Sequence, residues 1–310
     1  MEMTGHSKQI GGLVFAFLVI TSMKFVLAEA DQPPAAQGIT PKAAASQSGE
    51  TATAAPANEA TKFIEAATDR LGWRKIRSLR CSTSTETIIP TPNGSSTLTM
   101  KSRTSFEAPD RAFSEMEITT NGRTSRTYKV TDGAFVESGA LSPDGKRSPA
   151  RKVPFDPMQH SAMMAGADPY NERFVRYENL KKVTVDGADP LFQKDDGSPL
   201  DNLDMTVLTG TAGDVKIEAF ADSKTVRLAA MRIYNSGKLV GDYSHIRHED
   251  IGQGVIYAVG YKFKAYPPAE GTDAKAPAGP TTTVTVSDVE LNPQIDPDIF
   301  KFSSDVTPAE

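Results

Sequence analysis

The chain has a single cysteine, Cys81, among its 310 residues. One thiol can form neither an intramolecular disulfide nor a zinc site of several thiolates, so packing and hydrogen bonds must hold the fold. An excess of positive charge is also missing, because 34 lysines and arginines stand against 39 aspartates and glutamates, giving a formal net charge of −5. Nucleic-acid binders need a basic surface. We therefore expect no nucleic-acid partner, and a packed free thiol at Cys81.

Signature motifs of common enzymes are absent as well. The sequence holds no G-x-S-x-G string and no P-loop lysine motif, and residues 252–257 lack the third glycine of a dinucleotide fingerprint. His245 and His248 are three residues apart, so on a strand they would point to opposite faces and could share a metal ion only across a bulge. We expect no cofactor, no metal site and no catalytic residue.

An acidic stretch near residue 200 raises the question of calcium. The spacing of its aspartates does not match the ligand pattern of an EF-hand loop, so a solvated acidic turn is the simpler interpretation. The aspartates concerned are Asp195, Asp196, Asp201 and Asp204.

The first 28 residues have the organisation of a secretory signal peptide. A short n-region precedes an unbroken apolar run over residues 10–20, and small residues at the −3 and −1 positions, Val26 and Ala28, favour cleavage after Ala28. The alternative is an uncleaved anchor, but a spanning helix needs about 20 apolar residues, and Lys24 interrupts this segment. We therefore expect an exported protein.

The mature chain begins with a segment unsuited to folding. Residues 29–60 contain eleven alanines and four prolines but one bulky aliphatic residue, Ile39. Such a composition cannot bury enough apolar surface to offset its ordering entropy, which predicts a disordered linker over 29–57. The folded domain is expected over 58–303, followed by a flexible tail, 304–310.

One amphipathic helix is predicted at the start of the domain. Apolar residues recur at helical spacing over 60–71, Asn58 is a suitable N-cap, and Gly72 supplies the stop. Trp73 is expected to pack at the end of this helix. The apolar stripe of the helix needs a partner surface.

Alternating strands and short turns follow the helix. Turn signals at Asn93-Gly94, Asn121-Gly122 and Asp132-Gly133 separate strand patterns over 79–137. Short connections of this kind produce antiparallel pairs, because parallel crossovers need a dozen or more residues. The sequence therefore predicts a meander of four or five strands with one apolar face and one wet face.

The middle of the chain is irregular before strand patterns return. Residues 142–154 read as a polar, basic loop, and Asp156-Pro157 starts a predicted helix over 158–165. Further strands are predicted between 182 and 291, with a long hairpin loop over 266–280. The total is ten or eleven strands and two or three helices, an α+β protein built on an antiparallel sheet.

With this architecture in place, the chain resembles the outer-membrane lipoprotein carrier (LolA-like) superfamily, in particular the lipoprotein-sorting branch. The resemblance depends on the order of elements, on Gly241-Asp242-Tyr243 leading to Gly254-Val255-Ile256-Tyr257, and on the closing strand with its N-x-x-I-x-x-x-x-F tail ending at Phe300. It covers about residues 58–303. Added loops over 139–156, 190–202 and 267–280 depart from a minimal carrier.

The resemblance implies a strongly bent antiparallel sheet that forms an incomplete, half-open β-barrel, with two or three helices covering its concave face. The implied function is a non-enzymatic periplasmic carrier of lipoprotein acyl chains or other lipid, with an inner-membrane donor complex, an outer-membrane acceptor and peripheral membrane contact. The residues expected to line the apolar cavity are Leu98, Met100, Phe106, Met116, Ile118, Tyr128, Val130, Ile217, Met231 and Ile233. The residues expected to form the lid are Phe63, Ile64, Met158, Met163 and Met164.

Three alternatives stay open at this stage. The lining residues are equally suited to a solid core, and the methionine cluster to ordinary packing. A periplasmic sensor of mislocalised lipids could use the same half-barrel. A hydrolase could place His160, His245 and nearby carboxylates on the long loops, which would require a perturbed histidine in a cleft.

Overall fold

The computed structural model describes residues 58–91, 93–120, 122–155, 170, 175–194, 196–200, 203–266 and 279–303. The predicted signal segment, linker and C-terminal tail lie outside these residues, as does the predicted helix over 158–165. Within the described part of the chain, no helix has the length and apolar character needed to cross a membrane.

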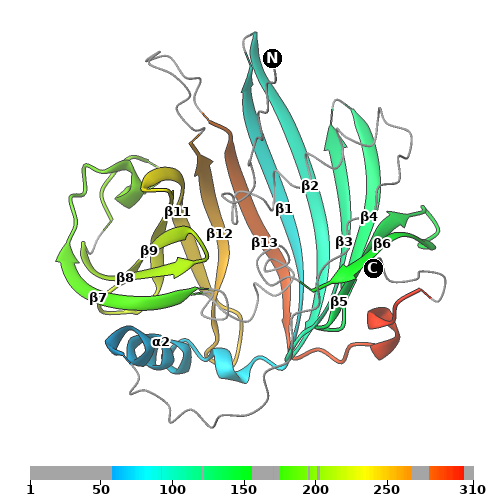
Figure 1. Ribbon diagram of the computed structural model, residues 1–310, viewed down its shortest axis with the longest axis horizontal. Helices are drawn as coiled ribbons and strands as arrows, with labels where there is room; N and C mark the ends of the chain where they lie inside the picture. The colour runs from blue at the N-terminus through cyan, green and yellow to red at the C-terminus, as the bar shows by residue number, and fades with distance from the viewer. Residues whose placement is uncertain are drawn as a thin grey trace, which may run out of the picture.

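One antiparallel sheet of thirteen strands forms the body of the protein (Figure 1). Along the sheet the strands are ordered β6-β5-β4-β3-β2-β1-β13-β12-β11-β10-β9-β8-β7. Their bounds are β1 (Ser78–Thr91), β2 (Gly94–Glu107), β3 (Arg111–Thr120), β4 (Arg123–Thr131), β5 (Phe135–Leu141), β6 (Arg147–Pro154), β7 (Arg176–Thr184), β8 (Asp204–Ala212), β9 (Val215–Asp222), β10 (Leu228–Asn235), β11 (Lys238–Asp250), β12 (Ile256–Ala265) and β13 (Thr281–Leu291).

The chain path explains this order. It starts at the centre with β1, runs outward by successive hairpins to β6 at one edge, crosses to β7 at the other edge and returns by hairpins to β13 beside β1. The meander order is therefore confirmed, with thirteen strands in place of the ten or eleven expected. β6 and β7 are the two edges and do not pair with each other, so the sheet is open. Figure 1 shows that β7, β8 and β9 run across the direction of β1 and β2, so the sheet is strongly bent.

The helix α2 (Glu59–Arg70) begins and ends as the sequence predicts. The Asn58 side chain accepts a hydrogen bond from the Thr61 amide at 2.8 Å. Gly72 has a φ of 74°, and a Cβ at this position would lie 2.6 Å from the Gly254 carbonyl oxygen. Glycine is therefore required both by the left-handed backbone and by the close approach of the turn before β12.

The helix packs against one face of the sheet, which we call the inner face; the opposite side is the outer face. Ile64 and Ala67 of α2 are buried in the same cluster as Phe106, Leu208 and Ile217 from the sheet. Trp73 follows the helix and donates a hydrogen bond from its indole nitrogen to the Ile256 carbonyl. The predicted role of Trp73 at the helix end is confirmed.

The expectation of two or three helices over the inner face is wrong for the described residues, which contain the single α-helix α2. The other helical segments are short 3₁₀ turns, too brief to cover a sheet. They are η1 (Trp73–Lys75), η3 (Pro190–Phe192) and η4 (Pro297–Phe300).

The predicted loop over 142–154 is also wrong, since most of it forms the strand β6 paired with β5. Its prolines, among them Pro149 and Pro154, argued against a strand. Proline is tolerated on an edge strand, where a missing N–H breaks no ladder, and β6 is an edge of this sheet.

The outer face of β3 to β5 is covered by the C-terminal segment. Phe300 is buried against Phe113 there, together with Ile295, Ile299 and Phe302. The Ser303 amide donates to Glu137, which also accepts a bond from Tyr128 at 2.7 Å. The closing sequence motif thus has a structural role, because its isoleucine and phenylalanine complete a second apolar cluster on the outer face.

The outer face of the other half has its own cover. Leu191 and Phe192 of η3 pack with Met205 and Phe220, and Leu200 and Leu203 pack against this cluster. Arg232 on β10 fixes this cover by an ion pair with Asp189 at 2.5 Å. The outer face is therefore apolar in two patches, in contrast to the wet face that the sequence predicts.

Candidate functional site

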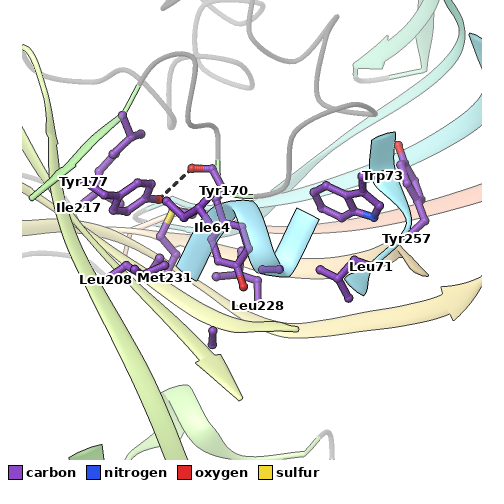
Figure 2. Close-up of a cluster of buried hydrophobic side chains, with 14 of the residues drawn as sticks. Ile64, Leu71, Trp73, Tyr170, Tyr177, Leu208, Ile217, Leu228, Met231 and Tyr257 are labelled. Atoms are coloured by element: carbon purple, nitrogen blue, oxygen red, sulfur yellow. Dashed lines mark hydrogen bonds between the residues drawn. The ribbon is translucent and has the colours of Figure 1, made fainter. Parts of the chain in front are cut away.

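Beneath α2 the inner face is filled with side chains. Figure 2 shows Ile64 close to Tyr170, Tyr177, Ile217 and Met231, with Tyr177 donating to the Tyr170 carbonyl at 2.8 Å. The Tyr170 hydroxyl in turn donates to the Val226 carbonyl at 2.6 Å. This part of the inner face is a packed core that holds the helix in place.

Several predicted lining and lid residues belong to that core. Phe106, Ile217, Met231, Ile233 and Ile64 each expose 3% of their surface or less. Phe63 is partly buried, and its ring meets the ring of Tyr170 edge-on at 6.2 Å. Phe63 and Ile64 thus lie over the inner face where the lid was expected.

A second group of predicted residues lies on the inner face away from α2. Leu98 and Ile118 are buried, while Met100 and Met116 are partly exposed. Strand pairing places Met100 directly opposite Ile118 on β3 and opposite Thr85 on β1. Met116 is opposite Ser102. This group therefore offers apolar surface that the described residues do not fully cover.

Register extends this surface across the centre of the sheet. Thr85 pairs with Val284 on β13, and Val284 pairs with Tyr261 on β12. Directly opposed residues in antiparallel strands lie on the same face. One row therefore crosses five strands, and we call it the central row: Tyr261, Val284, Thr85, Met100 and Ile118.

Three aromatic rings meet at the β12 end of the central row. The ring of Tyr243 lies 4.7 Å from that of Phe263 and 5.4 Å from that of Tyr261, measured between centroids. Tyr243 and Tyr261 are partly exposed, yet burial raises the pKa of Tyr261 to about 12 and that of Tyr243 well above its ordinary value. Their surroundings are thus poor in water although the rings are not fully covered.

Cys81 lies on the same face and is a buried free thiol, as the sequence predicts. Strand pairing sets it opposite Thr104 on β2. Burial raises the pKa of Cys81 to about 11, only partly offset by a hydrogen bond with Thr83. A thiol with so high a pKa is protonated at neutral pH and is a poor nucleophile.

Tyr128 and Val130 were expected beside the other lining residues, and this placement is wrong. Both are fully buried on the outer face, packed under Phe300 and the C-terminal segment. The β3–β4 hairpin pairs Met116 with Thr127, so the even-numbered residues of β3 share a face with the odd-numbered residues of β4. The other lid residues, Met158, Met163 and Met164, lie outside the described residues.

The residues named for a metal site or a hydrolase are not brought together in the part that the structure describes. That part contains no group of three histidine, cysteine or acidic side chains arranged to hold a metal ion. β11 does have a bulge between Ser244 and Arg247, and His245 Nδ1 lies 2.8 Å from the Ser244 hydroxyl. His160 is outside the described residues, as are Asp195 and Asp201.

Sequence reasoning missed the contribution of β12 to the inner face. Tyr257, Val259, Tyr261 and Phe263 recur at every second position, and this alternation alone is enough to predict one apolar face of a strand. It also missed Lys129, which lies on the inner face of β4. A lysine by itself does not distinguish the two faces of a strand, and only the register set by the turn at 121–122 places this one.

No family model matches the chain, and no curated protein sequence does. Solved structures do match. A LolA superfamily protein from Nitrosomonas europaea superposes with a TM-score of 0.51 at 14% identity, and the match covers 79% of this chain and 99% of that one.

Two further structures have lower scores. A domain described as an outer membrane lipoprotein-sorting protein, from Vibrio parahaemolyticus, gives a TM-score of 0.48 at 16% identity over 78% of this chain and 97% of that one. A DUF1329 family protein from Desulfovibrio piger gives 0.47 at 12% identity over 77% and 97%. The fold of this chain is LolA-like, and the resemblance drawn from the sequence is confirmed at the level of the fold.

Proposed function

We propose that this protein is a lipid or lipoprotein carrier that holds acyl chains on its inner face. The observation that carries the proposal is the central row, in which Met100 and Tyr261 stay partly exposed beside buried apolar neighbours. An acyl chain gains about 0.8 kcal/mol for each CH₂ group that it removes from water. An open, bent sheet suits this role because its inner face is not filled by a second sheet.

The binding region that we propose is narrower than the one expected from sequence. It comprises apolar residues of β2 and β3 that lie outside the packed core under α2, together with the aromatic rings of β11 and β12 that border this core. Binding by burial alone needs no catalytic group, so we propose a non-enzymatic protein. The residues are Leu98, Met100, Met116, Ile118, Tyr243, Tyr261 and Phe263.

The proposed location and partners follow from the N-terminal segment together with the fold. A cleaved signal peptide over residues 1–28 would deliver the protein to the periplasm, an aqueous space that lipids do not cross unaided. A carrier acting there takes its cargo from an inner-membrane donor and releases it to an outer-membrane acceptor. Contact with either membrane would be peripheral.

A transfer assay tests the proposal. Donor vesicles carry a self-quenched fluorescent diacyl lipid, acceptor vesicles carry none, and dequenching is followed with increasing amounts of the protein. We expect a transfer rate proportional to protein concentration. A rate equal to that of the vesicles alone, with folded protein present and with both diacyl lipid and acylated lipoprotein as cargo, would contradict the carrier function.

A further inference from the structure

Carboxylates occur on one face only of β1 to β6, whereas cations occur on both faces. Strand register places the glutamates of these strands on the outer face: Glu86, Glu107, Glu115, Glu117 and Glu137. The inner face of the same described strands carries three cations, Arg123, Lys129 and Arg151, and no carboxylate. This half of the inner face is therefore positively charged, although the chain as a whole has a net charge of −5.

Lys129 differs from the two arginines in its burial. Arg123 is exposed at the start of β4 and Arg151 is exposed on the edge strand β6, whereas Lys129 is partly buried on β4, which is paired on both sides. Its side chain makes no hydrogen bond or ion pair with any residue that the structure describes. Burial lowers the pKa of Lys129 below its ordinary value. An ammonium group removed from water without a partner is costly, and proteins normally pair such groups.

Hydroxyl groups flank Lys129 on both sides. Ser114 is its directly opposed neighbour on β3 and Ser138 on β5. Opposed residues have Cβ atoms about 5 Å apart, within reach of one small ligand group. The next strand continues the row with Thr104, whose hydroxyl lies 3.0 Å from that of Ser114. This polar row of one ammonium and three hydroxyls has the donors that an anion requires.

The other half of the inner face has the opposite character. β12 presents Tyr257, Val259, Tyr261 and Phe263, and β10 presents Met231 and Ile233 beside them. The inner face is thus apolar and aromatic over β9 to β13, and hydroxyl-rich and cationic over β3 to β5. The central row connects the two regions.

We propose that the ligand of the inner face is an acyl lipid with an anionic headgroup, and that the Lys129 ammonium with the Ser114 and Ser138 hydroxyls binds that headgroup. The proposal rests on the carrier function and narrows its cargo. The acyl chain lies along the central row toward the rings of β11 and β12, while the carboxylate or phosphate pairs with Lys129. Binding then supplies the partner that the buried ammonium lacks among the described residues.

The experiment compares ligands that differ only in the charge of the headgroup. Palmitate is measured against methyl palmitate, and lysophosphatidate against the monoacylglycerol of the same chain length, by equilibrium binding below the aggregation concentration of each. We expect at least one anionic ligand to bind about tenfold more tightly than its neutral partner. Preference within the first pair identifies a fatty carboxylate, and preference within the second identifies a phospholipid phosphate.

Variants of the whole protein test whether Lys129 causes the preference for anionic ligands. Lys129→Gln should reduce the affinity for the anionic ligand about tenfold and leave that for the neutral ligand unchanged, while Lys129→Arg retains the preference. Lys101→Gln is the matched control, because Lys101 is an exposed lysine on the outer face of β2. Thermal unfolding of each variant checks the fold, with Lys129→Met as a second removal of the charge.

The outcomes separate this inference from the carrier function. Equal affinity for charged and neutral ligands, or a preference that persists in Lys129→Gln, would overturn the headgroup site and leave the carrier function intact. Failure of all four ligands and of diacyl lipid to bind would instead remove the carrier function on which the inference rests.

Discussion

Placing a carboxylate in the middle of the central row should separate lipid binding from folding. Met100 is partly exposed on the inner face of β2. In the ligand-free protein the new carboxylate of Met100→Asp can therefore remain in contact with water. The variant should lose only about 1 to 2 kcal/mol of unfolding free energy, from reduced apolar burial and from the poor strand propensity of aspartate.

A bound acyl chain would cover the same carboxylate. To be buried without a partner the aspartate must first take up a proton, which at pH 7 and a pKa of about 3.9 costs about 4 kcal/mol. Since about 1.4 kcal/mol corresponds to a tenfold change, the affinity for an acyl chain should fall about 1,000-fold. Snorkelling of the side chain toward water would reduce this number, so it is an upper value.

The assay is direct titration with the methyl ester of a fluorescent polyene fatty acid, a neutral probe that avoids repulsion by the new charge. Thr97→Asp is the matched control, because Thr97 is an exposed residue on the outer face of the same strand. We expect parental affinity in Thr97→Asp. Parental affinity in folded Met100→Asp would refute the central row as the acyl site, and complete unfolding of Met100→Asp would show that Met100 is solid core.

Three further predictions concern stability and reactivity. Burial lowers the pKa of His248 from 6.5 to about 4, so the unfolded chain binds a proton at this residue at a higher pH than the native protein does. The free energy of unfolding should therefore decrease by about 3 kcal/mol between pH 6.5 and 4. Urea unfolding of His248→Gln should lack this decrease. Gly72→Ala should lower the free energy of unfolding by about 2 kcal/mol or more in the same assay, because residue 72 has a φ of 74° and the new Cβ would lie 2.6 Å from the Gly254 carbonyl oxygen. A loss under about 0.5 kcal/mol would contradict the close packing at the end of the helix. Cys81, with a pKa of about 11, should react with iodoacetamide at pH 8 about 100-fold more slowly in the native protein than in urea, and equal rates would argue against its burial.

The helix was predictable because its signals are local. Asn58 as N-cap, the apolar stripe and Gly72 all act within a few residues of the helix, and the structure confirms each of them. Local turn signals likewise predicted the antiparallel hairpins. The position of α2 on the sheet depends on distant contacts, such as the bond from the Asn58 amide to the Tyr177 carbonyl, and no local pattern encodes it.

The division of residues between faces was predictable in part. The two-residue turn at 121–122 pairs Thr120 with Arg123, so even-numbered residues of β3 must share a face with odd-numbered residues of β4. Applying this rule to the sequence would have placed Tyr128 and Val130 on the outer face. What covers them could not be predicted, because Phe300 reaches them from the far end of the chain.

The strand β6 and the segments that cover the outer face were not predicted, for a different reason. Pro149 and Pro154 favoured the prediction of a loop over residues 142–154. These prolines are compatible with a strand because β6 lies at the edge of the sheet, and the sequence does not reveal this edge position. The sequence likewise predicts an inserted loop over 190–202. Its apolar residues pack on Met205 and Phe220, which the sequence alone did not separate from the inner face.

The central claim is that the inner face carries acyl chains, and native mass spectrometry tests it most directly. The protein is purified from a cell envelope without detergent, its intact mass is measured, and the bound material is extracted and identified. The account predicts a co-purifying acylated species at about one per chain, with an anionic headgroup if Lys129 has the role proposed here. A protein that is ligand-free as purified, and that stays so after incubation with phospholipid, fatty acid and acylated lipoprotein, would contradict the account.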